Sequence, residues 1–323
     1  MKSANNLRSD VFWAVAALAL LAALPFLTQS RVALDFVIRL ASLGIFATSL
    51  NILVGYGGLV SFGHAMYFGG GAYVFGLLMQ NTGAPIPAAM LGAIGFCGLL
   101  GLVVGAICVR LKEIYFSFLT LAFQMLLHSV ILTWTSLTGG DQGLTGGIPR
   151  PPFWGINLAD HTTLYWFACV LGVLCLLLIR TVLQSPFGAT LRMVRDNAER
   201  AAFLGIDVWR IKLYAYILAS CMASIGGILM ALFVSGAFPD FGYWTMSGDA
   251  IFMIMMGGLH VFIGPMVGAS LLLLFNDIIT RSTEFHGLAL GLVVLLFALG
   301  FKRGITDFAI DLFHPSNKNG EPK

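Results

Sequence analysis

Long stretches of this chain carry no Asp, Glu, Lys or Arg. The longest runs from Leu40 to Val109, and others cover Ile114–Gly140, Leu213–Pro239 and Phe285–Phe301. About 20 apolar residues in a helix are enough to cross a bilayer, whereas a soluble core of this size would need a charged surface. Only 10% of the residues are charged and 58% are hydrophobic. Because helices satisfy their own backbone hydrogen bonds in lipid, the sequence predicts an all-α integral membrane protein.

The apolar runs divide into about ten expected transmembrane helices, which together form a single transmembrane domain over residues 1–323. The first apolar run has no convincing small-residue cleavage site at its end, so we interpret it as a retained helix rather than a signal peptide. The eighth helix is short, and it is either complete, broken or re-entrant. The expected crossings are 11–29, 34–54, 58–80, 87–109, 114–134, 162–181, 211–235, 246–259, 263–280 and 285–301.

Positive charge is unevenly divided between the two expected faces. If the N-terminus is cytoplasmic, only Arg31, Arg39, Arg150 and Arg281 of the 18 Lys and Arg residues fall outside. By the positive-inside rule, both tails (1–10 and 304–323) are therefore expected in the cytoplasm. The segment 185–207 lies on the same side. The loop 135–161 lies outside, and its many Gly and Pro residues predict ordered turns.

The segment 185–207, SPFGATLRMVRDNAERAAFLGID, is unusually polar for this chain. Ser185 and Pro186 are typical of a helix start, and Gly205 of a helix end. Asp207 is placed to cap the next helix. The spacing predicts one helix with a small apolar face and an i,i+4 pair between two of its charged residues. The apolar positions are Leu191, Val194, Ala198 and Ala201, and the expected pair is Asp196–Arg200.

Two interpretations of this helix are open. It is either a solvated amphipathic connector, including one resting on anionic lipid, or a docking element for another protein. The alanines and the glycine contribute little apolar area for anchoring in lipid, but they allow a close approach by a protein. These residue types therefore favour docking.

Within the segment, ERAAFLGI (199–206) resembles the E-A-A-x-x-x-G coupling motif of ABC importer permeases. The wider sequence is similar to the LivM-type permeases of branched-chain amino acid transporters, and the resemblance covers most of residues 40–305. Four further blocks carry it: LNILVGYGGLVSFGHAMYFGGGAYV (50–74), YFSFLTLAF (115–123), SLTGGDQGLTGGIP (136–149) and GGLHVFIGPMVGA (257–269). The chain departs from the family where Arg200 separates Glu199 from Ala201, and where MYFGGGAY carries an extra glycine.

The resemblance implies a heteromeric importer in a bacterial cytoplasmic (inner) membrane. This chain would form half of the translocation pathway, and a second, LivH-type permease subunit would form the other half. Two cytoplasmic ABC ATPase subunits would bind ATP-Mg, and a periplasmic substrate-binding protein would deliver the solute. The chain has no G-x-x-x-x-G-K-[ST] phosphate loop, so the resemblance leaves ATP hydrolysis to the partners. Membrane lipid is the only other expected partner; no nucleic-acid partner and no cofactor bound by this chain are expected.

Residues with an expected role fall into two groups. The resemblance places ATPase coupling on the polar segment. The translocation path is expected to include an intramembrane histidine, two of its neighbours and one acid near an expected outer helix end. For each path residue, packing or a solvated position is an equally simple interpretation. The coupling residues are Arg192, Arg195, Glu199, Ala201, Ala202 and Gly205, and the path residues are Gly63, His64, Tyr67 and Asp249.

The substrate and the transport class have alternatives. The same machinery carries urea, short amides or aromatic carboxylates in relatives, and the residues do not separate these from amino acids. An ion-coupled secondary carrier would show paired carboxylates within the membrane, and a membrane enzyme would show a cluster of His, Asp or Glu. The scattered acids and histidines favour neither class. The five cysteines lie in apolar runs without a C-x-x-C pair, so we expect no metal or redox site.

Overall fold

The computed structural model describes residues 30–144, 146–152, 157–282, 285–300 and 304–306, together with Leu18, Leu21 and Pro25. The expected first crossing, 11–29, lies outside the described residues except for those three positions. The expected tails 1–10 and 304–323 also lie outside them, apart from 304–306. Every regular element that the described residues form is helical, as the sequence predicts.

The helices follow one another with short connections. The long ones are α2 (Arg31–Asn51), α3 (Ala65–Thr82), α4 (Ile86–Cys108), α5 (Glu113–Thr133), α7 (His161–Gln184), α10 (Val208–Val234), α11 (Trp244–Gly257), α12 (Gly264–Ser282) and α13 (His286–Gly300). The short ones are η1 (Ile52–Tyr56), α6 (Thr135–Thr138), η2 (Gly140–Gln142), α8 (Pro186–Asp196), α9 (Ala198–Phe203) and η3 (Pro239–Gly242).

Five helical stretches in the described residues are long and apolar enough to cross a membrane. They are Arg31–Tyr56, Ile86–Cys108, Ile114–Thr133, His161–Gln184 and Val208–Val234. Each matches an expected crossing within a few residues, so a multi-pass helical membrane protein is confirmed. The other four expected crossings within the described residues correspond to α3, α11, α12 and α13, of which α11 has only 14 residues. The total of ten spans stays a prediction.

Helix α10 forms the centre of the bundle and packs against α2, α3 and α4. Small residues allow these close approaches, as is usual between membrane helices. A Cβ placed on Gly227 would lie 1.9 Å from the carbonyl oxygen of Phe68, and one on Gly71 would lie 2.5 Å from Ser224 Oγ. Gly71 of the expected third crossing and Gly227 of α10 therefore allow α3 and α10 to pack closely.

The third crossing begins later than the sequence predicts. We expected a helix from residue 58, but α2 runs into the π-helical turn η1, and α3 begins only at Ala65. The intervening residues are not helical: Gly58 has a φ of +67°, and the Leu59 N–H donates to the Leu53 carbonyl at 2.8 Å. Glycine tolerates this left-handed backbone without strain. The glycine-rich sequence therefore contains both a break between η1 and α3 and glycines that pack against neighbouring helices.

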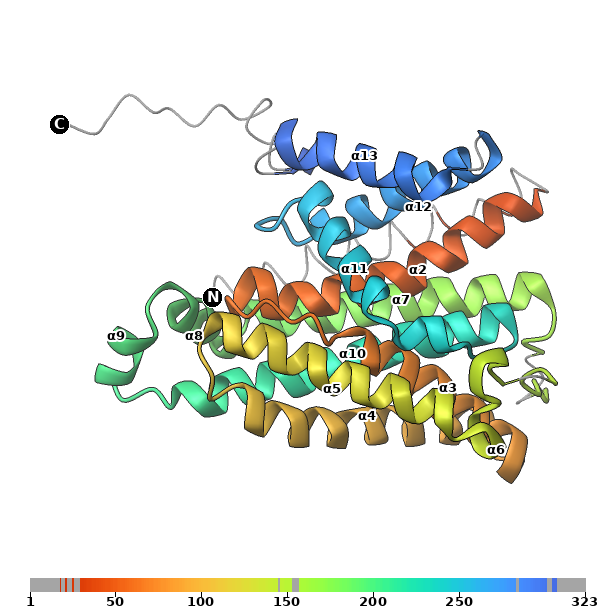
Figure 1. Ribbon diagram of the computed structural model, residues 1–323, viewed down its shortest axis with the longest axis horizontal. Helices are drawn as coiled ribbons and strands as arrows, with labels where there is room; N and C mark the ends of the chain where they lie inside the picture. The colour runs from red at the N-terminus through yellow and green to blue at the C-terminus, as the bar shows by residue number, and fades with distance from the viewer. Residues whose placement is uncertain are drawn as a thin grey trace.

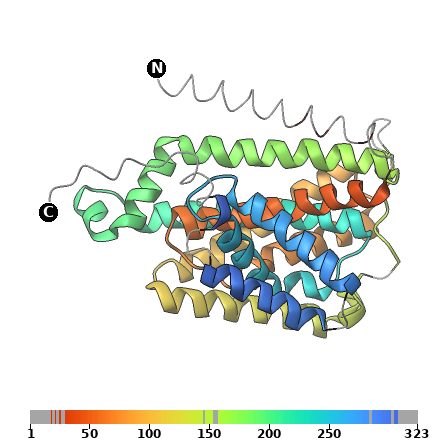
Figure 2. The same cartoon turned by 90° about the horizontal axis from the view of Figure 1, so that it is seen from above.

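The bundle has two distinct ends (Figure 1). Helices α8 and α9 project at one end, and α6 lies at the other. The last three helices, α11 to α13, lie together beside α2, and α7 extends along one edge in the perpendicular view of Figure 2. The polar segment and the described part of the loop 135–161 therefore lie at opposite ends of the bundle, as expected for segments on opposite sides of a membrane.

Candidate coupling segment and solute cavity

The polar segment contains two helices instead of the single helix that we predicted. Helix α8 ends at Asp196, Asn197 adopts an extended backbone with φ −160° and ψ 102°, and α9 follows. The Asn197 side-chain oxygen accepts a hydrogen bond from the Arg200 N–H at 2.8 Å. Asparagine competes with helix continuation by bonding to nearby backbone in this way. Asn197 therefore acts as the N-cap of a new helix.

The ends of the segment follow the prediction only in part. Asp207 caps α10 by accepting a hydrogen bond from the Arg210 N–H at 3.1 Å. Pro186 is the first residue of α8, but the Ser185 hydroxyl caps nothing, because it donates to the Val182 carbonyl at 2.6 Å. Gly205 follows α9 with a φ of +83°, a backbone that favours glycine.

The apolar stripe of the segment is covered by the chain itself. Leu191, Val194 and Ala201 are buried, and Ala198 is half-buried. Helix α8 packs against α7, α10 and η1. The stripe that we expected to be free for another protein is therefore used to hold the segment onto the bundle.

A different apolar surface is exposed at the tip of the segment. Phe203 is 91% exposed and Leu204 is 68% exposed, and Glu199 and Ala202 beside them are also exposed. We call Glu199, Ala202, Phe203 and Leu204 the exposed tip. Sequence periodicity missed Phe203 and Leu204, because their exposure results from the break at Asn197. The sequence signal that could have identified them is the presence of two adjacent large apolar residues in an otherwise polar segment.

Arg195 joins the polar segment to the helix break. Its Nη1 donates to the Gly55 carbonyl of η1 at 2.6 Å, and its stem packs against Gly58, where an added Cβ would lie 2.9 Å from Arg195 Cγ. Arg192 lies over the Tyr56 ring at 5.8 Å, a cation–π contact. The two arginines expected to take part in coupling thus both contact the π-helical turn.

The expected ion pair between Asp196 and Arg200 is not formed. The Asp196 Oδ1 instead accepts from Arg195 Nη2 at 2.8 Å and from Arg195 Nε at 3.0 Å. The cause is again the chain break at Asn197, which ends the regular i,i+4 spacing on which that prediction depended.

Three of the four expected path residues lie in the packed interior. His64 and Tyr67 are fully buried, and a Cβ on Gly63 would lie 2.2 Å from the Thr120 carbonyl oxygen. The rings of His64 and Tyr67 contact each other edge-on at 6.0 Å. None of the three lines the cavity described below.

His64 has one defined hydrogen-bond partner. The Ser49 hydroxyl donates to the Phe46 carbonyl at 2.7 Å, and His64 Nε2 lies 2.8 Å from the same hydroxyl oxygen. Because the only hydroxyl proton is used, Nε2 must carry the proton and donate to Ser49. Nδ1 is then an acceptor, and it is buried without a partner among the described residues.

A buried chain of polar contacts holds the N-terminus of α3. The Ala65 N–H donates to Ser247 Oγ at 2.8 Å, and the Ser247 hydroxyl donates to Gln124 Oε1 at 2.9 Å. Gln124 Nε2 donates to the Gly242 carbonyl at 3.2 Å. These contacts link α3, α5, η3 and α11. Sequence reasoning missed them, because a single Ser or Gln in an apolar run does not identify its partner.

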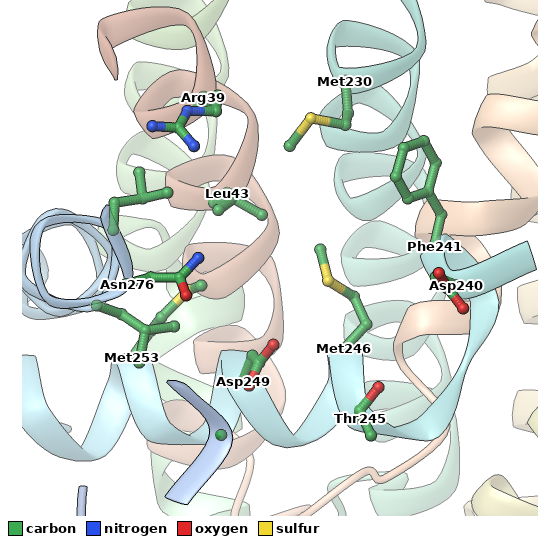
Figure 3. Close-up of a pocket in the computed structure, with 13 residues that line it drawn as sticks. Arg39, Leu43, Met230, Asp240, Phe241, Thr245, Met246, Asp249, Met253 and Asn276 are labelled. Atoms are coloured by element: carbon green, nitrogen blue, oxygen red, sulfur yellow. The ribbon is translucent and has the colours of Figure 1, made fainter. Parts of the chain in front are cut away.

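Asp249, the fourth expected path residue, lines a cavity of about 530 Å³. Helices α2, α10, η3, α11, α12 and α13 contribute to its walls, and Figure 3 shows ten of the lining side chains by name. Arg39 is also in the lining, and it forms an ion pair at 2.5 Å with Asp277. Arg39 was not among the predicted path residues. An arginine inside the expected span 34–54 was the sequence signal for a functional role, because charged residues within membrane spans are usually tied to function. The lining consists of Arg39, Leu43, Met230, Asp240, Phe241, Thr245, Met246, Asp249, Met253, Leu272, Leu273, Asn276 and Gly287.

The family model for the permease component of branched-chain amino acid transport systems matches residues 32–299. The chain belongs to this permease family. The match includes all of the long helices in the described residues except the first residue of α2 and the last residue of α13. Among the described residues, no group of three or more His, Cys, Asp or Glu side chains is arranged to hold a metal ion.

Individual permease proteins are also similar to the chain. The chain is 27% identical over 320 residues to the high-affinity branched-chain amino acid transport system permease protein LivM of Escherichia coli K12, covering 90% of this chain and 73% of that protein. It is 26% identical to the Salmonella typhimurium LivM, with the same coverage. It is also 28% identical over 204 residues to the autoinducer 2 import system permease protein LsrC of Salmonella typhi, covering 60% of this chain and 54% of LsrC. No solved structure matches the chain.

Proposed function

We propose that this chain is one permease subunit of an ATP-driven importer for branched-chain or related amino acids. The observation that carries the proposal is the family match over residues 32–299, joined to a polar segment with an exposed apolar tip. In the proposed assembly the other half of the pathway belongs to a second, LivH-type permease subunit. A periplasmic binding protein delivers the amino acid.

The exposed tip is the proposed contact with an ABC ATPase subunit that binds ATP-Mg. Its apolar area, concentrated in Phe203 and Leu204, is suited to a pocket on a partner, since large apolar side chains at the centre of an interface carry much of the binding free energy. Arg195 then connects this contact to η1. Movement of the ATPase subunits would therefore reach the membrane helices through α8.

The orientation proposed from the Lys and Arg distribution agrees with this arrangement. It places α8, α9 and both tails in the cytoplasm, where ATP is available, and the loop 135–161 outside. The proposed location is a bacterial cytoplasmic membrane. The alternative is an ion-coupled carrier, for which paired carboxylates within the membrane are expected; Asp35 and Asp277 pair instead with His161 and Arg39.

Phe203→Glu tests the proposed ATPase contact. We expect the assembled ATPase subunits to be lost on purification, or ATP hydrolysis stimulated by the loaded binding protein to fall at least about tenfold, because a charge is placed in an apolar interface. The thermal stability of the chain itself should not change, since the side chain is 91% exposed. Phe203→Leu is the matched control and should retain assembly. Normal ATPase assembly and uptake in the Glu variant would refute the contact.

ATP-driven uptake of L-leucine by the complete assembly in proteoliposomes tests the proposed function as a whole. Uptake should require three components together: ATP on the side of the membrane that the ATPase subunits face, the binding protein, and this chain. Uptake that continues without ATP but follows a proton or sodium gradient would support the ion-coupled carrier instead.

A further inference from the structure

The cavity beside Asp249 gathers polar chemistry that is rare in this chain. Arg39, Asp240, Asp249 and Asn276 line one space, although only 10% of the residues are charged. These residues come from α2, η3, α11 and α12, so the bundle brings them together from distant parts of the sequence. The volume of about 530 Å³ lies within the range of about 300–1,000 Å³ usual for small-molecule sites.

The Asp249 carboxylate is without a partner in the part of the chain that the structure describes. Among the described residues, no hydrogen bond or ion pair reaches it, although the residue is half-buried. A carboxylate withdrawn from water is costly unless it is paired, and ionisable groups within membrane proteins are usually tied to function. An unpaired acid facing a cavity is therefore suited to a cationic group on a ligand.

Arg39 offers a complementary group on the same cavity. Its Nη2 is engaged by Asp277, and the Arg39 side chain as a whole is still 27% exposed. In Figure 3, Arg39 lies above Asp249, with Leu43 between them. A guanidinium nitrogen with a free N–H is a donor for a carboxylate. The two ends of the cavity therefore differ in the charge that they favour.

The wall between the charged residues is apolar and adaptable. Methionine supplies several of its members, and methionine side chains adjust to irregular aliphatic shapes. Leucines and one phenylalanine complete the wall. Such a wall can accept a branched aliphatic group, because these side chains have no polar group that would lose a hydrogen bond. The apolar lining residues are Leu43, Met230, Phe241, Met246, Met253, Leu272 and Leu273.

We propose that this cavity is a transport site for the zwitterionic form of an aliphatic amino acid. Asp249 binds the α-ammonium group, Arg39 binds the α-carboxylate, and the Met and Leu wall holds the side chain. The proposal rests on the proposed function as a permease and adds the substrate chemistry that the chain itself recognises.

The charges of the lining distinguish between the candidate substrates. Asp240 and Asp249 line the same cavity as Arg39, which Asp277 already neutralises in part. An aromatic carboxylate without an ammonium group would meet two acids and gain little from the arginine. Urea and short amides can donate hydrogen bonds to Asp249, but they have neither a cationic group to pair with its charge nor a branched aliphatic group for the Met and Leu wall. An amino acid satisfies both ends of the cavity.

Two of the helices that line the cavity, α2 with its continuation η1 and α11, are closely packed at the ends that lie away from the cavity. A Cβ on Gly55, at the end of η1, would lie 2.8 Å from the Leu259 carbonyl oxygen, and one on Gly257 would lie 1.8 Å from the Gly264 carbonyl oxygen. In the proposed orientation these contacts lie on the cytoplasmic side and the cavity lies in the outer half. The site would then receive solute from the binding protein while the inner end is closed.

The first test uses the complete transporter in proteoliposomes with radiolabelled L-leucine. Asp249→Asn keeps the shape but removes the charge, so uptake should fall at least about tenfold, as expected when a charge-assisted hydrogen bond is lost. ATPase stimulation by the loaded binding protein should persist, which shows that the assembly is intact. Asp249→Glu should recover part of the uptake. Asp35→Asn is the matched control and should transport normally: Asp35 lies on the same helix as Arg39 but outside the cavity lining, and the asparagine keeps an oxygen that can accept a hydrogen bond from His161.

The second test measures ligand binding without the binding protein. The wild-type permease–ATPase complex in nanodiscs is examined by saturation-transfer NMR with L-leucine, 4-methylpentanoate, which lacks the ammonium group, and 3-methylbutylamine, which lacks the carboxylate. We expect a signal for leucine, much weaker signals for both analogues, and loss of the leucine signal in Asp249→Asn. If that variant does not assemble, the comparison of the three ligands on the wild type decides.

Two results would overturn the site. One is leucine uptake by Asp249→Asn with the wild-type KM and maximal rate, and the other is equal binding of leucine and 4-methylpentanoate to the wild type. Both leave the importer function intact, because the wild type still transports leucine. Failure of the wild-type assembly to import any amino acid with ATP would instead remove the proposed function, so the two failures are distinguishable.

Discussion

Arg195 provides the sharpest test of how the polar segment is connected to the membrane helices. Its guanidinium makes two contacts of different kinds: a hydrogen bond of 2.6 Å to the Gly55 carbonyl, and an ion pair of 2.8 Å with Asp196. The Arg195 side chain is 30% exposed and that of Asp196 is 67% exposed. The first contact joins two elements far apart in sequence, whereas the second joins neighbours.

The two contacts are expected to differ in free energy. A hydrogen bond from a charged donor is worth about 1.5–3 kcal/mol, and partial exposure places this one near the lower end. An exposed ion pair is worth about 0–1 kcal/mol. Arg195→Met keeps an unbranched stem against Gly58 but removes the guanidinium, so we expect a loss of about 1.5–2 kcal/mol in local stability. Asp196→Asn removes only the ion pair and should cost less than about 1 kcal/mol.

The assay compares amino acid imported with ATP hydrolysed in reconstituted transporters. Arg195→Met should lower this ratio several-fold while the ATPase subunits still co-purify, because α8 is no longer fixed to η1. Asp196→Asn should leave the ratio unchanged, and Arg195→Lys should lie between them, since one donor remains. An equal ratio for Arg195→Met and Asp196→Asn would refute the reasoning that the Gly55 contact carries the movement.

Two further predictions concern the packed interior. Gly227→Ala places a Cβ 1.9 Å from the Phe68 carbonyl oxygen, so it should destabilise the chain by about 1–3 kcal/mol or more, measured as thermal unfolding in detergent. Gly95→Ala meets no atom within 4 Å and should be neutral or slightly stabilising; equal melting temperatures for the two variants would contradict the packing argument. Ser49→Ala leaves the buried Nε2–H of His64 without its acceptor and should cost about 1–3 kcal/mol, and an unchanged melting temperature would show that the hydrogen bond contributes nothing.

The residues of the polar segment illustrate the limit of local patterns. Pro186 and Gly205 marked its two ends correctly, because a proline start and a glycine end depend only on local backbone chemistry. The break at Asn197 was not predicted, since an asparagine is also tolerated within a helix. In the folded chain its side chain caps α9, and α8 is held against α7, α10 and η1.

The cavity shows the same limit on a larger scale. Asp249 was a candidate from its place near an expected helix end, whereas Arg39 was assigned only to the outer face. Their common cavity depends on the packing of α2 beside α11 and α12, which no spacing within the sequence records. His64 stood out as a lone ionisable group, but its partner Ser49 was one of many serines in apolar runs.

The sequence by itself determined that this chain is a helical membrane protein, where most of its helices lie, and to which permease family it belongs. These properties follow from transfer free energies and backbone hydrogen bonding, which act on each segment separately. Only the tertiary structure decided where the polar segment breaks, which carbonyl Arg195 holds and which side chains share a cavity. Those features depend on side chains from distant helices meeting at a few ångströms, and such contacts are set by how the whole bundle packs.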